Sequence, residues 1–156
     1  MSEIKTLTLT QGAWEEISLH AVETFPEECC GVILQGASDA VRRCRNIQNT
    51  LHALDPERYP RNATIAYAMD LNEIESIIRE AENTGEKVKA FYHSHPNHEA
   101  YFSQEDKAFA TPFGEPAFPD SAYIVISIYD RVIKRISAYA WSQEKRDFVE
   151  IPLKKL

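Results

Sequence analysis

The chain has 156 residues, of which 44% are hydrophobic and 26% are charged, a balance typical of a globular protein. A chain of this length buries about 70% of its unfolded surface on folding, so it needs no disulfide framework, and we expect one domain over residues 1–156. The net charge of −7 argues against nucleic acid or an anionic membrane as the main partner.

The cysteines and the N-terminal segment indicate the compartment. There are only three cysteines, and two of them, Cys29 and Cys30, are adjacent, which does not suit a disulfide framework. The N-terminal segment "MSEIKTLTLTQGAWEE" lacks the apolar core of a secretory signal, and no apolar run of about 20 residues occurs. The sequence therefore predicts a cytoplasmic protein without a membrane-spanning segment.

The first third of the chain alternates strand and helix patterns. Residues 4–10 alternate apolar and polar side chains and predict a strand. Residues 11–25 repeat apolar side chains at intervals of three and four, which predicts a helix that ends before a proline. The apolar run 29–36 predicts a buried strand that pairs with residues 39–49 through a short turn. Residues 51–62 contain two prolines and are expected to form a loop.

Residues 70–85 carry the clearest helix pattern. We expect Asp70 to be the N-cap, with Glu73 completing a capping box and Gly85 ending the helix. The expected apolar stripe consists of Leu71, Ile74, Ile78 and Ala81.

The remaining patterns are those of strands. Residues 87–95 predict a strand that a proline ends, residues 122–130 and 131–142 predict a hairpin, and residues 147–151 predict a last strand. The sequence thus predicts an α/β domain with a mixed, mostly antiparallel sheet flanked by two main helices.

The segment "FYHSHPNHEAYFSQED", residues 91–106, has the composition of a site. His93 and His95 are two apart at the end of a predicted strand, so both imidazoles point to the same face. The alternative is that two of the five histidines happen to lie together on a solvated strand end.

The second half of this segment also has two interpretations. Ser103 and Asp106 have the spacing of a capping box for a helix "QEDKAFA". If Asp106 faces His93 and His95, however, the three residues form a set that zinc accepts, with a fourth position open for water.

A metal-bound water also requires a base. Glu27 and Glu28 directly precede the apolar strand at 29–36, where a carboxylate is unexpected unless it has a function. The alternative is an ordinary charged turn between a helix and a strand.

Together these residues resemble the JAMM motif of the active MPN metalloproteases. The matching pattern is His93-Ser-His95, seven residues, then Ser103-x-x-Asp106, with an upstream glutamate in "PEECCG". In the prokaryotic members this glutamate lies three residues before a glycine, which selects Glu28. The resemblance covers nearly the whole chain.

This resemblance implies a cytidine-deaminase-like fold and zinc-dependent hydrolysis of peptide or isopeptide bonds. It implies that His93, His95 and Asp106 bind one zinc ion with a water as fourth ligand. Glu28 would transfer the proton and Ser103 would bind the oxyanion.

The chain lacks room for the insertions with which eukaryotic deubiquitinases hold ubiquitin chains. The substrate expected from the resemblance is therefore a ubiquitin-like or sulfur-carrier protein cleaved after its C-terminal Gly-Gly. The segment "NHEAYF" lacks the small and proline residues of many relatives, and we expect His98 and Glu99 to lie in a solvated loop.

Three other functions are compatible with parts of the sequence. The chain could be an inactive MPN scaffold, although none of the expected metal ligands is missing. It could be a cysteine hydrolase that uses Cys29 or Cys30, or a zinc deaminase, although the His-x-Glu and Pro-Cys-x-x-Cys patterns of deaminases are absent from the sequence. Whether the protein forms a homo-oligomer stays open.

Overall fold

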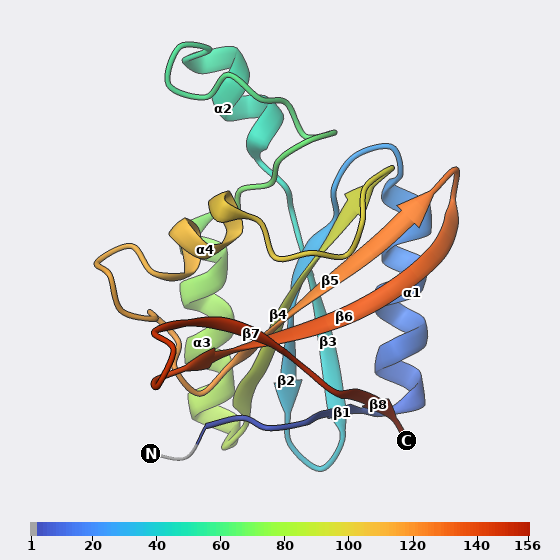
Figure 1. Cartoon of the computed structure of the whole chain (residues 1–156), viewed down its shortest axis with the longest axis vertical. Coiled ribbons are helices and arrows are strands. Elements are labelled where there is room, and N and C mark those ends of the chain that lie inside the picture. Colours follow the sequence, from blue (N-terminus) through green and yellow to red (C-terminus); the bar gives the residue numbers. More distant parts are fainter. Residues whose placement is uncertain (1–2) are drawn as a thin grey trace.

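The computed structural model describes residues 3–156, so the first two residues of the expected domain lie outside the described part. A six-stranded sheet runs through the centre of the molecule (Figure 1). Its strands, in spatial order, are β3 (Asp39–Cys44), β2 (Cys30–Gln35), β4 (Lys87–Pro96), β5 (Ala122–Tyr129), β6 (Val132–Ser142) and β7 (Asp147–Ile151). Within this six-stranded sheet only β4 and β5 pair in parallel, which confirms the predicted mixed and mostly antiparallel sheet.

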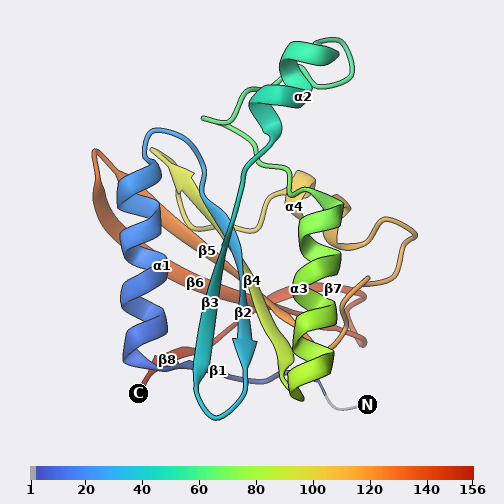
Figure 2. The ribbon, with the colours of Figure 1, turned by 180° about the vertical axis from the view of Figure 1, so that it is seen from behind.

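Each face of the sheet has its own hydrophobic core. The helix α1 (Gln11–Thr24) covers one face with Ile17 and Ala21, and the helix α3 (Leu71–Thr84) covers the other with Ile74 and Ile77 (Figures 1 and 2). Alternate strand residues supply the two cores, as the period of two requires.

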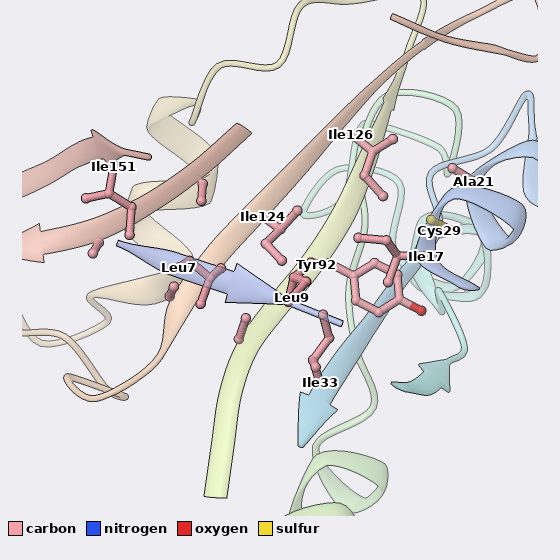
Figure 3. Packing of buried hydrophobic residues seen from close by; sticks show 14 of the residues in the cluster. Leu7, Leu9, Ile17, Ala21, Cys29, Ile33, Tyr92, Ile124, Ile126 and Ile151 are labelled. Carbon is pink, nitrogen blue, oxygen red and sulfur yellow. The ribbon is translucent and has the colours of Figure 1, made fainter. Parts of the chain in front are cut away.

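Residues near both ends of the described chain pack into the core beneath α1. The short strand β1 (Leu7–Leu9) pairs in parallel with β8 (Leu153–Lys155), which was not expected from the sequence. Leu7 and Leu9 pack in the same cluster as Tyr92 and Ile124 of the sheet (Figure 3). These contacts hold both ends against one face of the sheet.

Several predicted elements are found where the sequence places them. The hairpin of β5 and β6 turns at Asp130 and Arg131, whose φ angles of 49° and 64° suit a two-residue type I′ turn. The helix α4 (Gln104–Ala110) begins after Ser103, as expected. The longest helices among residues 3–156 have 14 residues, and none combines the length and apolar character that a bilayer crossing requires.

The prediction for residues 39–62 is partly wrong. The strand β3 ends at Cys44, and a helix, α2 (Gln48–Leu54), occupies part of the expected strand and of the expected loop. This helix, the adjoining chain, α4 and the end of β4 lie at the same end of the molecule (Figure 1).

The details at the start of α3 also differ from the prediction. Asp70 is the N-cap, but its side chain accepts from the backbone N–H of Asn72. Glu73 accepts a hydrogen bond from the backbone of Arg45 instead of completing a capping box. Leu71 is 74% exposed, and Ile77 takes the buried position that the sequence assigned to Ile78.

Candidate active site

The histidines of the His-x-His pattern lie side by side at the end of β4. They share the face of Phe91, which is the face that α3 covers. His93 and His95 are only 1% and 6% exposed, and their Nε2 atoms are 3.1 Å apart. Because β5 pairs with β4 at both histidines and β2 pairs with it at His93, the backbone of this pair is firmly held. The burial excludes the alternative of a solvated strand end.

Asp106 reaches the histidines from the first turn of α4. Its backbone N–H donates to Ser103 Oγ and its Oδ2 accepts from the Ser103 N–H, both at 3.0 Å, so the capping box is formed. The same Oδ2 lies 3.1 Å from His93 Nε2 and 3.4 Å from His95 Nε2. The capping and the ligand interpretations of "SQED" are therefore compatible, because the cap fixes the carboxylate that faces the imidazoles.

The donor set fits one small cation. Ligand atoms bound about 2.0–2.1 Å from a tetrahedral zinc ion lie about 3.3 Å from one another. The three ligand atoms here are separated by 3.1, 3.1 and 3.4 Å, and among residues 3–156 this is the group of side chains with such spacing. Three buried acceptor atoms repel one another unless a proton or a cation lies between them, so the geometry favours a metal site.

The electrostatics of the cluster support the same conclusion. Burial opposes ionisation of Asp106, but His93 and His95 outweigh it and hold the pKa of this carboxyl below its usual range. Burial lowers the pKa of the His93 imidazole, although Asp106 opposes the shift. For His95 burial acts in the same direction, but hydrogen bonds to Asp106 and to the Glu99 carbonyl reverse it and raise the pKa. Metal binding therefore competes with a proton on His95.

Glu28 lies beside this cluster, immediately before β2. It is 5% exposed, and burial raises the pKa of its carboxyl to about 8, while His95 lowers this pKa and Asp106 raises it to smaller extents. A proton-transferring group works best when its pKa is near the working pH. Glu27 points elsewhere, since its carboxylate accepts from the Asn49 amide at 3.0 Å. The structure thus brings Glu28, and not Glu27, to the candidate site.

A pocket of about 630 Å³ opens beside the cluster. His95, Ser103, Asp106 and Glu28 line one side of it. The other side comes largely from the chain between α2 and α3 and from α4, with Gln48, Arg58, Tyr59, Pro60, Arg61, Ile65, Ala66, Tyr67, His98, Tyr101, Glu105 and Phe109. All five residues with proposed roles thus lie in or directly behind one pocket.

Tyr67 is the site residue that sequence reasoning missed. Its ring stacks on the ring of His93, with centroids 4.4 Å apart and an angle of 23° between the planes. It lies in the irregular segment between α2 and α3, so no helix or strand pattern marks it.

A protein-family model described as prokaryotic homologs of the JAB domain matches residues 10–142. The chain belongs to this family. Its JAB domain is 30% identical over 145 residues to the desampylase of Haloferax volcanii, a match that spans 89% of this chain and 90% of the desampylase. It is also 34% identical over 111 residues to the CysO-cysteine peptidase of Mycobacterium tuberculosis, spanning 71% of this chain and 66% of the peptidase.

Solved structures share the fold of this JAB domain. A protein from Desulfitobacterium hafniense matches with a TM-score of 0.69 and 21% identity, covering 96% of this chain and 92% of that one. A JAB1/MPN domain protein from Archaeoglobus fulgidus matches with a TM-score of 0.55 and 16% identity, covering 97% and 98%. The family, the fold and the class of hydrolytic enzyme expected from the sequence are confirmed.

The loop between the motif halves of the JAB domain is better ordered than the sequence suggests. Ser127 Oγ donates to the carbonyl of His98, and the side chain of His98 lines the pocket. The hydroxyl of Tyr139 donates to the carbonyl of Ala100, two residues after His98, at 2.5 Å. His98 and Glu99 are nonetheless exposed, as expected for a solvated loop.

The cysteines of the JAB domain lack the features of a nucleophile. Cys29 and Cys30 are 2% and 0% exposed, and all three thiols are free. Burial raises the pKa of the Cys29 thiol to about 12 and raises that of Cys30 as well. A reactive cysteine needs a lowered pKa and access to substrate, so the cysteine-hydrolase alternative loses support.

Proposed function

We propose that this protein is a zinc-dependent peptidase or isopeptidase that cleaves the bond after the C-terminal Gly-Gly of a ubiquitin-like or sulfur-carrier protein. The observation that carries the proposal is the convergence of His93 Nε2, His95 Nε2 and Asp106 Oδ2 within 3.4 Å in a pocket lined by Glu28. The family and the names of the two curated relatives support it.

His93, His95 and Asp106 would hold a single zinc ion, because two imidazoles and one carboxylate suit zinc and leave a fourth position for water. When bound, zinc lowers the pKa of that water to about 7 and polarises a carbonyl group.

Glu28 is the proton-transferring group in this proposal. Its carboxylate takes a proton from the attacking water and delivers it to the nitrogen of the departing amine as the C–N bond breaks. A carboxyl whose pKa burial raises to about 8 can both accept and release a proton near neutral pH.

Ser103 is the proposed oxyanion donor. Its Oγ already accepts from the Asp106 N–H, and a hydroxyl can accept one hydrogen bond while donating another. The free O–H would donate to the scissile carbonyl oxygen as negative charge develops there. A donor in this position typically stabilises the transition state by about 3–4 kcal/mol.

The proposal extends to the cellular setting. We place the protein in the cytoplasm, because its three thiols are free and buried and suit a reducing compartment. A net charge of −7 favours a protein substrate over nucleic acid or an anionic membrane. We treat the whole chain as one catalytic domain, and the oligomeric state stays open.

The test is a cleavage assay with purified, zinc-loaded protein. The substrate is a ubiquitin-like carrier extended past its C-terminal Gly-Gly by a short peptide, and mass spectrometry measures the carrier that ends at Gly-Gly. We expect cleavage that a chelator stops and added zinc restores. Zinc-loaded protein that cleaves no carrier extension would favour the inactive scaffold instead.

A further inference from the structure

Asn46 lies between β3 and α2 and uses the full hydrogen-bonding capacity of its side chain. Its Nδ2 donates to the carbonyl of Glu28 at 3.0 Å and to that of Ala66 at 3.1 Å. Its Oδ1 accepts from the backbone N–H of Gln48 at 3.0 Å and from that of Ala68 at 3.1 Å. An amide side chain offers two donor hydrogens and two acceptor positions, and all are used here.

Two of these contacts flank the residue that stacks on a metal-site histidine. Ala66 and Ala68 are the neighbours of Tyr67, whose ring lies against that of His93. Asn46 therefore fixes the backbone on both sides of Tyr67. A bridge between Asn46 and Met69 strengthens the same contact between the two segments.

Hydrogen bonds also hold the backbone on both sides of Glu28, the proposed proton-transferring group. The N–H of Glu28 donates to the Ala63 carbonyl at 2.8 Å, and the N–H of the next residue, Cys29, donates to Ser94 Oγ at 2.8 Å. Ser94 lies between the two metal-site histidines. Since the Asn46 side chain also donates to the Glu28 carbonyl, the peptide groups before and after Glu28 are both held by hydrogen bonds to other segments of the site.

We propose that Asn46 is a positioning residue that keeps the Glu28 carboxylate in register with His93, His95 and Asp106, by binding the Glu28 carbonyl and both peptide neighbours of Tyr67. This inference rests on the proposed function, since it assigns Asn46 an effect on the proton transfer by Glu28. The Asn46 side chain forms its hydrogen bonds with backbone groups, and we infer that it acts on the reaction through Glu28.

The variant Asn46→Asp distinguishes the hydrogen bonds that the Asn46 side chain donates from those that it accepts. An aspartate has the same shape and keeps an acceptor for Gln48 and Ala68, but it cannot donate to the carbonyl of Glu28. The matched control is Asn62→Asp, which adds the same charge at an exposed position of the adjoining loop and keeps the oxygen that accepts from the Thr64 N–H. Asn46→Ser, which adds no charge and retains one donor, is the second variant if Asn46→Asp folds poorly.

The experiment measures kcat, KM and zinc content on the zinc-loaded variants with the carrier extension as substrate. We expect Asn46→Asp to lower kcat by about 10- to 100-fold, as loss of a supporting hydrogen bond behind a metal site does, with KM and zinc content close to wild type. Asn62→Asp should keep the wild-type kcat. In the metal-free protein, amide hydrogen exchange at Glu28 should be faster in Asn46→Asp than in either wild type or Asn62→Asp.

A double variant distinguishes positioning from general loosening of the fold. Because Asn46 acts through Glu28, Asn46→Asp combined with Glu28→Asp should lower kcat by less than the product of the two single effects. The inference would be overturned if the losses in kcat of the two single variants multiply in the double variant. It would also be overturned if Asn46→Asp and Asn46→Ser both fold and keep the wild-type kcat. Wild type that cleaves no carrier, or Glu28→Gln with full activity, would instead overturn the proposed function itself.

Discussion

The Nδ1 atom of His95 lies 2.9 Å from the backbone carbonyl of Glu99. A carbonyl oxygen only accepts hydrogen bonds, so Nδ1 carries the hydrogen and donates it. In the neutral imidazole this leaves the lone pair on Nε2, the atom that faces His93 and Asp106. The loop between the two halves of the motif thus sets the tautomer that a metal ligand needs.

We therefore expect about one zinc ion per chain in protein purified without chelators, measured by elemental analysis. His95→Ala should lose most of this zinc, because one of three ligand atoms is removed. The matched control is His98→Ala, since His98 lines the same pocket but is outside the ligand cluster. Equal zinc loss in both variants, or no zinc uptake by wild type, would contradict the assignment.

The two adjacent glutamates provide a second test. Glu28→Gln should reduce turnover to near background while zinc content and melting temperature stay close to wild type, because an amide cannot carry the proton. Glu27→Gln should retain most activity, since Glu27 contacts Asn49 outside the pocket. If Glu27 instead proves to be the essential residue, the assignment of the proton-transferring group is wrong.

Glu28 should also make the stability of the metal-free protein depend on pH. Burial raises the pKa of this carboxyl from 4.5 to about 8, so the folded state binds the proton more tightly than the unfolded state. Its contribution to the free energy of unfolding is fully present below about pH 4.5 and is lost as pH rises through about 8.

The measurement is chemical denaturation of metal-free wild type and metal-free Glu28→Gln between pH 5 and about 8.5. Wild type should lose a few kcal/mol relative to the variant as pH rises, since each unit of pKa shift corresponds to about 1.4 kcal/mol. The comparison cancels the titration of groups distant from Glu28, which both proteins share. Parallel pH profiles would show that Glu28 is not buried as described.

The parts of the site that the sequence predicts are those that depend on short local patterns. The period of two places His93 and His95 on one face of a strand, and Ser103 with Asp106 has the spacing of a helix start. The structure adds that Asp106 of α4 contacts His93 of β4, which brings the two patterns together.

The rest of the site depends on long-range contacts. The prolines of residues 51–62 indicate a loop, yet the first residues of this range belong to the helix α2. The start of α2 is held by the side chain of Asn46, which accepts from the Gln48 N–H. Glu73 has the spacing of a capping box at Asp70, but a backbone N–H of Arg45, distant in sequence, competes for its carboxylate. Local spacing cannot reveal such competition.

Thiol and metal reagents should act very differently on this enzyme. Alkylation of the native protein with iodoacetamide should leave cleavage unchanged, because the three thiols are buried and burial raises their pKa values. A zinc chelator should abolish cleavage, and added zinc should restore it. Loss of activity after alkylation at full zinc content would return the cysteine-hydrolase interpretation to consideration.

Ser103 has one observed role, as the N-cap of α4, and one proposed role, as the oxyanion donor, and the two roles predict different losses. As an N-cap it accepts from the Asp106 N–H, and removing the hydroxyl should cost about 1 kcal/mol of stability. As the oxyanion donor it should contribute about 3 kcal/mol to the barrier, or roughly a hundredfold in kcat. The backbone N–H of Ser103 still binds Asp106 Oδ2 in Ser103→Ala, so the zinc content should be preserved.

Thr10→Ala is the matched control for Ser103→Ala, because Thr10 caps α1 by accepting from Ala13 at 3.2 Å and lies outside the pocket. Both variants should show a similar modest fall in melting temperature, whereas only Ser103→Ala should lose kcat, with KM changed little. Since the cap is lost in both, the difference in kcat measures the hydroxyl at the reacting carbonyl. Equal kcat in the two variants, with zinc bound, would mean that Ser103 serves only as a cap and that another group stabilises the oxyanion.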